Sequence, residues 1–546
     1  MRKPILYRPL AALLCVIVLL AALLTGCGGK DRENAKLREG AAFTVAVTDM
    51  PDTLNPTTTS GGLSEEFFLL AYDPLWRLNA SGEPVNCLVE DFDLSSDQLT
   101  WTIRLRHDVT FSDGVPLTSR DVKYTYELMM RVSDTYAPYF DGVTTIRCPD
   151  NYTVVITTAF VKGDMQNNPT PILPRHIWTD HENALDQFEN TEMVGTGPFI
   201  YTVPEKIDPQ EMSWTFQARQ NYFGEPANVG QVSFIYYSTA TGAARALQAS
   251  EVDAGLGMTD VQLTTLEEVP GVELIQTVLP KSEVWAIAFN TREGFFSDET
   301  MRQAIEYCTD REWILSMSSG RAGMTGSVWA SPGTDYFYQV SNKRGYDPET
   351  ARSIITATGR YADINGNGYL QSKITEDPLR LSLYVSSEDE WAATAATIIV
   401  DALDGIGVAV DWNTTDKPIQ EVCTPKASWD MCMLTWYGDT NAMMAALPFR
   451  SSTSSLTGWS NGNYDQVLSQ LQEAMDGTLI QNLAGQLQQI MYNECPYVVI
   501  GYRSDIQAIR RDAWTGYEDV LAQSGGLFNI GSADIYMSVT PVETRG

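Results

Sequence analysis

Segments predicted to form strands and helices are intermixed along almost the whole chain, and this order constrains the fold most. Alternating stretches such as FTVAVTD (43–49) and TWTIRLR (100–106) place apolar side chains on one face, as in a half-buried strand. Helices are predicted between such strands, for example over 241–250, 299–308 and 390–404. This mixture indicates an α/β or α+β fold. A chain of 546 residues is too long for one hydrophobic core, so two or three domains are expected.

The start of one helix is predicted by its local sequence. An Asp-Gly turn at 113–114 follows the strand 100–106. Thr118 and Asp121 then form a capping-box pair ahead of the apolar-patterned stretch VKYTYELMM. A helix is therefore expected to begin at about this pair.

The N-terminal segment has the features of an export signal. Three basic residues precede an uninterrupted apolar run at 11–24. This run has 14 residues, fewer than the about 20 that a membrane-spanning helix needs. Residues 1–26 are therefore interpreted as a secretory signal peptide.

The signal ends in Leu24-Thr25-Gly26-Cys27, which resembles the lipobox of bacterial lipoproteins. In that motif the cysteine becomes the lipidated first residue, so Cys27 is the predicted lipidation site. The alternative is an ordinary signal peptide with a chance cysteine. Polar residues follow, and 27–42 is predicted to be a lipidated cysteine with a flexible tether. The protein is expected to be anchored by acyl chains to the outer face of the cell membrane, or on its periplasmic side.

The net charge limits the classes of partner. It is −32 for the whole sequence, and removing the three basic residues of the signal makes it about −35. Such an acidic surface argues against nucleic acid and anionic lipid as partners.

Sequence patterns of several enzyme and cofactor classes are absent. The chain contains no HExxH, no P-loop and no GxGxxG motif. Its three histidines are His107, His176 and His181, and they lack the spacing of a zinc site. No catalysis, no resident metal and no cofactor are expected.

One loop resembles part of a calcium-binding loop. Asp363, Asn365, Asn367 and Gly368 fit its positions 1, 3, 5 and 6. Position 12 is Ile374, where a bidentate glutamate is required. The favoured interpretation is a surface turn rich in Asx and glycine residues.

Several stretches in order resemble one known family. LTWTIRLRHDVTFSDGVPLTSRDVKYTYE (99–127) is the most specific of them. It is accompanied by DTLNP (52–56), LAYDPLWRLNASGEPV (70–85), VGTGPFIY (194–201) and MRQAIEYCTDREWIL (301–315). Together they resemble the solute-binding lipoproteins of ABC importers, extracellular solute-binding protein family 5, which bind oligopeptides, dipeptides or nickel.

The resemblance implies a periplasmic-binding-protein-like fold (type II, cluster C). This is an α/β clamshell of two lobes with an extra domain, whose first domain is discontinuous because the chain crosses between the lobes twice. Closure of such lobes is a hinge motion. The implied limits are 43–75, 197–282 and 500–546 for domain I, 76–196 for domain II, and 283–499 for domain III.

The resemblance also indicates a ligand site. Peptide-binding members hold a peptide between the lobes as an added strand, and an aspartate in a W-x-x-D segment binds its α-amino group. Trp436-Tyr437-Gly438-Asp439 matches this pattern, although the proline that follows in many relatives is missing. Asp439 would pair with the ammonium, Gly438 would admit peptide backbone, and Trp436 and Tyr437 would form walls. The alternative is a β-turn.

Three further residues are candidates. Ser64 and Glu65 match a polar segment that lines the cleft in relatives, or else form the first turn of a helix. Arg450 is a candidate partner for a ligand carboxylate, or an exposed arginine.

The implied function is that of a monomeric, lipid-anchored receptor that captures peptides and delivers them to the membrane permease of an ABC importer. A nickel-chelate-binding or oligosaccharide-binding member of the family is one alternative. An anchored cell-wall hydrolase and a peptide-sensing lipoprotein are alternatives of other classes.

Overall fold

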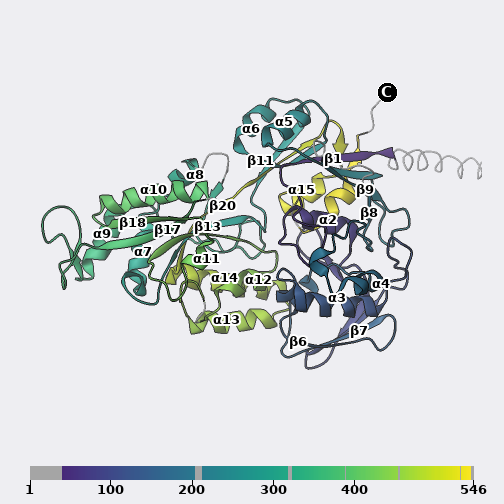
Figure 1. The fold of residues 1–546 in the computed structure, drawn as a ribbon, viewed down its shortest axis with the longest axis horizontal. Coiled ribbons are helices and arrows are strands. Elements are labelled where there is room, and N and C mark those ends of the chain that lie inside the picture. The colour runs from purple at the N-terminus through teal and green to yellow at the C-terminus, as the bar shows by residue number, and fades with distance from the viewer. Residues whose placement is uncertain are drawn as a thin grey trace, which may run out of the picture.

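The structure is a computed structural model that describes residues 40–202, 212–317, 323–387, 389–452, 455–528 and 531–542. The predicted signal peptide, Cys27 and nearly all of the tether lie outside the described residues. Within these residues, three sheets of four or more strands, with helices between them, form a mixed α/β fold as predicted (Figure 1). No helix in the described part of the chain is long and apolar enough to cross a membrane.

The first sheet has seven strands and is visited three times by the chain. Its strands, in spatial order, are β12 (Val272–Thr277), β21 (Asp505–Arg510), β11 (Ala254–Met258), β1 (Ala42–Val47), β10 (Gln231–Tyr236), β9 (Ser213–Ala218) and β8 (Phe199–Thr202). The chain leaves this sheet after β1 and after β12 and returns each time. One face is covered by α5 (Ala240–Gln248) and α6 (Asp260–Glu267), the other by α2 (Leu63–Ala71), α15 (Glu518–Ser524) and α16 (Asp534–Ser538) (Figure 1).

The second sheet is antiparallel and has four strands. They are, in spatial order, β4 (Val89–Leu94), β5 (Thr100–Leu105), β7 (Thr153–Thr158) and β6 (Val143–Arg147). Helix α3 (Ser119–Val132) packs on this sheet. The predicted capping box is confirmed, because the Thr118 N–H donates to the Asp121 carboxylate at 2.9 Å.

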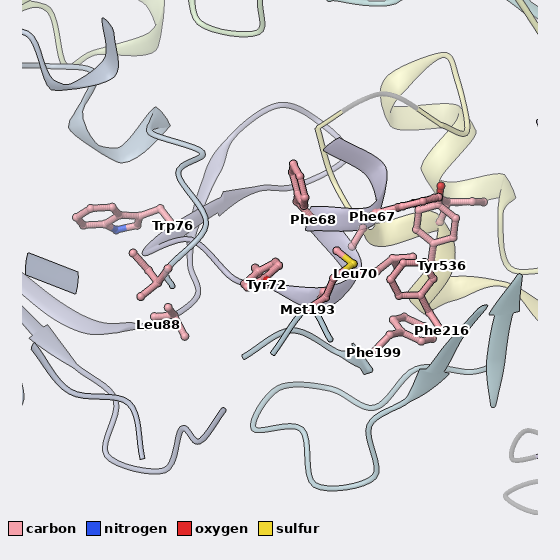
Figure 2. Close-up of a cluster of buried hydrophobic side chains, with 14 of the residues drawn as sticks. Phe67, Phe68, Leu70, Tyr72, Trp76, Leu88, Met193, Phe199, Phe216 and Tyr536 are labelled. Atoms are coloured by element: carbon pink, nitrogen blue, oxygen red, sulfur yellow. The ribbon is translucent and has the colours of Figure 1, made fainter. Parts of the chain in front are cut away.

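Helix α2 joins these two sheets through one continuous core. Figure 2 shows Phe67 of α2 directed toward Phe216 and Tyr536, while Trp76 and Leu88 lie at the opposite end of the cluster. The ring centroids of Phe67 and Phe216 are 5.2 Å apart. We call the two sheets and their helices the first lobe, because they share this core.

The third sheet has six strands and its own helices. Its strands, in spatial order, are β14 (Gly323–Thr325), β20 (Tyr497–Arg503), β13 (Glu283–Phe289), β19 (Met431–Tyr437), β17 (Arg380–Ser386) and β18 (Ala409–Thr415). One face packs on α7 (Glu299–Tyr307), α8 (Arg311–Met317), α9 (Pro348–Ala357) and α10 (Glu390–Gly405), the other on α12 (Ala442–Ala446), α13 (Gly462–Glu473) and α14 (Gly477–Glu494). We call this unit the second lobe.

Two short connections join the lobes. Residues 278–282 link β12 to β13, and Ser504 links β20 to β21. The predicted domain limit at residue 500 falls inside β20, so the second crossing lies slightly later than predicted. The other domain limits remain predictions.

Candidate ligand site between the lobes

The segment that carries Asp439 follows strand β19 and packs against the first connection. β19 pairs with β13, and beyond the end of β19 the Gly438 N–H donates to the Ser282 carbonyl at 3.1 Å. A Cβ atom at Gly438 would lie 2.2 Å from the Pro280 carbonyl oxygen. The glycine is therefore required for this close approach, which differs from its predicted role of admitting ligand backbone.

The Asp439 carboxylate is half-buried and receives hydrogen bonds from both lobes. The Asn441 N–H donates to Oδ1 at 2.8 Å, and the Tyr139 hydroxyl of the first lobe donates to Oδ2 at 3.2 Å. Burial raises the pKa of Asp439 above its ordinary value, while the positive charge of Lys281 acts to lower it. The Tyr336 hydroxyl donates to the Asp439 carbonyl oxygen. The result is a fixed carboxylate at the junction of the lobes.

Lys281, in the first connection, lies beside carboxylates from both lobes. Its Nζ is 2.6 Å from Oε2 of Glu65, which stands in the first turn of α2. Burial acts to lower the pKa of Lys281, but the carboxylates of Glu65 and Asp439 outweigh it and raise that pKa. The structure thus brings two predicted site residues, Glu65 and Asp439, near each other. The Lys281 ammonium beside them was not predicted.

Two further contacts join the lobes near this site. Asn441, which caps α12, donates through Nδ2 to the Asp164 carboxylate at 3.3 Å. The Gly163 N–H donates to the Gln472 carbonyl at 3.0 Å. A Cβ atom at Gly163 would lie 1.9 Å from the Ala474 carbonyl oxygen. The lobes therefore meet closely enough here that only glycine fits.

Comparison with known proteins agrees with this two-lobe arrangement. A family model described as bacterial extracellular solute-binding proteins, family 5 (middle), matches residues 83–457, which is more than half of the chain. The chain belongs to this family. A curated relative, the oligopeptide-binding protein AppA of Bacillus subtilis, is 23% identical over 449 residues, which cover 78% of this chain and 80% of AppA.

Solved structures show the same fold. AppA of Bacillus subtilis in complex with a nonapeptide has a TM-score of 0.68 at 20% identity, covering 93% of this chain and 100% of that one. NikZ of Campylobacter jejuni in complex with Ni(L-His) has a TM-score of 0.67 at 18% identity, covering 88% and 95%. The predicted type II two-lobe fold of this solute-binding family is therefore confirmed.

The two predicted aromatic walls have different surroundings. Trp436 is half-buried and packs edge-on against Phe449 and Tyr497, at centroid distances of 5.5 and 5.6 Å. It lines a cavity of about 10 Å³, which is room for about one water molecule. Tyr437 is 69% exposed, and its hydroxyl donates to Glu283 at 3.3 Å. Trp436 thus belongs largely to the core of the second lobe, and a wall role for either residue remains a prediction.

The Ser64 side chain forms its hydrogen bonds within the first lobe. It is fully buried, its hydroxyl donates to Asp52, and it accepts a 3.2 Å hydrogen bond from the Thr53 N–H. These bonds fix the loop before α2, so Ser64 has a structural position in place of the predicted cleft-lining one. Arg450 is exposed directly after the 3-10 helix Leu447–Phe449, and its proposed ligand contact remains a prediction.

The calcium-like loop forms the turn favoured by the sequence analysis. The Asp363 carboxylate accepts hydrogen bonds from the Asn367 and Gly368 N–H groups at 3.1 and 3.0 Å. Ile374, at position 12, is 88% exposed. Among the residues that the structure describes, no group of three or more His, Cys, Asp or Glu side chains is placed to hold a metal ion.

One segment matches the GxSxG pattern of serine hydrolases without its structural setting. The match is Gly458-Trp459-Ser460-Asn461-Gly462. The nucleophile of such enzymes stands on a turn between a strand and a helix. Here residues 455–461, which include the first four residues of the match, are irregular, and Asn461 caps α13. The pattern therefore has the position of a helix start.

Sequence reasoning missed several residues of this site. They are Tyr139, Lys281, Asn441, Asp164 and Gly163, and Tyr336 joins them through its bond to the Asp439 carbonyl. For Asn441 alone the sequence holds a signal: an asparagine directly before a short apolar stretch is typical of a helix N-cap.

Proposed function

We propose that this solute-binding protein captures peptides between its two lobes and that Asp439 binds their free α-amino group. The observation that carries the proposal is the half-buried Asp439 carboxylate at the lobe junction, held by Asn441 and Tyr139. An ionised carboxylate has about four acceptor positions. These two donors and the Thr440 hydroxyl, which donates to Oδ1 at 3.5 Å, use three of them, so the carboxylate retains capacity for an N–H group of an ammonium.

The relatives support the same ligand class. The curated relative is named as an oligopeptide-binding protein, and a structural neighbour was solved with a nonapeptide. We further propose three domains with the predicted limits, the last crossing moved to Ser504, and hinge motion at 278–282 and Ser504. Ligand would favour the closed form by its higher affinity for that form.

Transport and anchoring complete the proposal. The protein delivers its peptide to the permease of an ABC importer while acyl chains on Cys27 hold it at the membrane. Replacing Cys27 by Ala tests the anchor: the variant should leave the membrane fraction. Retention of the Cys27→Ala protein in that fraction would contradict lipidation at this residue.

The ligand class is tested by thermal unfolding of the protein with di- to hexapeptides, a nickel–histidine chelate and oligosaccharides. A ligand at 100 times its dissociation constant adds about 2.7 kcal/mol to the free energy of unfolding. Stabilisation by peptides supports the proposal. Stabilisation by the chelate or the sugars alone would replace it with the corresponding alternative.

A further inference from the structure

The first connection between the lobes holds a lysine at the candidate amine site. On both sides of this residue the connection is hydrogen-bonded to the second lobe: the Ser331 hydroxyl donates to the Leu279 carbonyl, and the Gly438 N–H donates to the Ser282 carbonyl. The Lys281 ammonium lies 2.6 Å from the Glu65 carboxylate, and their side chains are only 30% and 27% exposed. This ion pair is therefore partly removed from water.

The charges around the site leave one carboxylate for a ligand. Glu65 and Asp439 come from different lobes, and the negative charge of each acts on the ammonium of Lys281. Glu66 adds a smaller effect, but its buried carboxylate accepts a hydrogen bond from the Tyr536 hydroxyl. Lys281 makes its direct contact with Glu65, while Asp439 is held by the neutral donors Asn441 and Tyr139. Without Lys281, the two carboxylates would attract two positive charges.

We propose that Lys281 is a specificity-determining residue: by occupying Glu65, it limits the site to one positive charge at the amino end of a peptide. This inference rests on the proposed function, because it assumes that Asp439 binds the α-ammonium. A second cation close to the α-ammonium, such as the side chain of a first-position lysine or arginine, then finds Glu65 already paired. Peptides whose first side chain is uncharged therefore bind more tightly than peptides that begin with lysine or arginine.

The test compares two peptides of matched length, norleucyl-alanyl-alanine and lysyl-alanyl-alanine. Their dissociation constants are measured by calorimetry for the wild-type protein and for Lys281→Met. The variant frees Glu65, so the affinity ratio should shift by about tenfold toward the lysyl peptide, the size expected for a partly buried charge pair. Lys281→Arg keeps the charge and should keep the wild-type ratio.

A second variant keeps the inference testable if Lys281→Met does not fold. Glu65→Gln removes the partner of Lys281 and leaves the ammonium free to pair with Asp439. Binding of norleucyl-alanyl-alanine should then weaken by about tenfold, while binding of its N-acetyl form should not change. An unchanged peptide ratio in Lys281→Met, or equal effects on both forms in Glu65→Gln, would overturn the role of Lys281. Failure of the wild-type protein to bind any of these peptides would instead contradict the proposed function.

Discussion

The hydroxyl of Tyr139 donates a 3.2 Å hydrogen bond to the carboxylate of Asp439. Tyr139 lies in the 3-10 helix Ala137–Phe140 of the first lobe, whereas Asp439 follows β19 of the second. One carboxylate therefore takes part both in lobe contact and in the proposed ligand contact. A ligand that binds Asp439 would therefore bind at a contact between the two lobes.

Removing this hydroxyl should shift the unliganded protein toward an open form. A net hydrogen bond contributes about 0.5–1.5 kcal/mol, so Tyr139→Phe should raise the open-to-closed ratio by about two- to tenfold. X-ray scattering without ligand should show a larger radius of gyration. Tyr126→Phe is the matched control, because the buried Tyr126 hydroxyl has no hydrogen-bond partner among the described residues. Equal scattering curves for both variants would show that the bond does not hold the lobes.

Gly163 offers a steric test of the same contact. The added methyl of Gly163→Ala would meet the Ala474 carbonyl, so the lobes should be held apart and peptide affinity should fall. Gly477→Ala is the control, because a Cβ atom there meets nothing within 4 Å. Scattering and calorimetry on both variants check this. Wild-type affinity in Gly163→Ala would mean that the Gly163–Ala474 contact is not part of the ligand-bound form.

The separate cores predict two unfolding transitions. Phe67→Ala opens the shared core of the first lobe and should cost about 3–5 kcal/mol in that lobe alone. Phe289→Ala should do the same in the second lobe, where Phe289 is fully buried against Phe296. Differential scanning calorimetry should show one transition lowered by each variant. If both variants lower one common transition equally, the lobes do not unfold as separate units.

Peptide affinity should fall in acid. Burial raises the pKa of Asp439, and the charge of Glu65 adds to this while that of Lys281 opposes it. A bound ammonium favours the ionised carboxylate and lowers that pKa in the complex. Binding below the raised pKa must therefore release a proton, and affinity is lost as the pH falls through it, by up to about tenfold per unit.

Titration calorimetry from about pH 7 to about pH 4 measures this loss. An N-acetylated peptide of the same sequence is the control and should not show it. Parallel losses for both peptides would assign the effect to another group.

Local structure could be predicted from the sequence, whereas the contacts between lobes could not. The alternating stretch 100–106 forms β5, and the predicted helix 390–404 forms α10. Both could be predicted because the spacing of apolar residues along a short stretch of sequence indicates its secondary structure. Tyr139 and Asp439 are 300 positions apart, so their contact depends on how the lobes meet. The requirement for glycine at position 438 likewise depends on Pro280, which lies in the first connection between the lobes, far from Gly438 in the sequence.

The central claim is tested most directly at Asp439. Asp439→Asn keeps the shape of the side chain and removes its charge. The dissociation constants of a free-amine peptide and of its N-acetyl form should be compared in the wild-type protein and in this variant. We predict that the free-amine peptide loses at least about tenfold in affinity while the N-acetyl peptide changes little. Equal losses for the two peptides would contradict the assignment of Asp439 as the group that binds the α-amine.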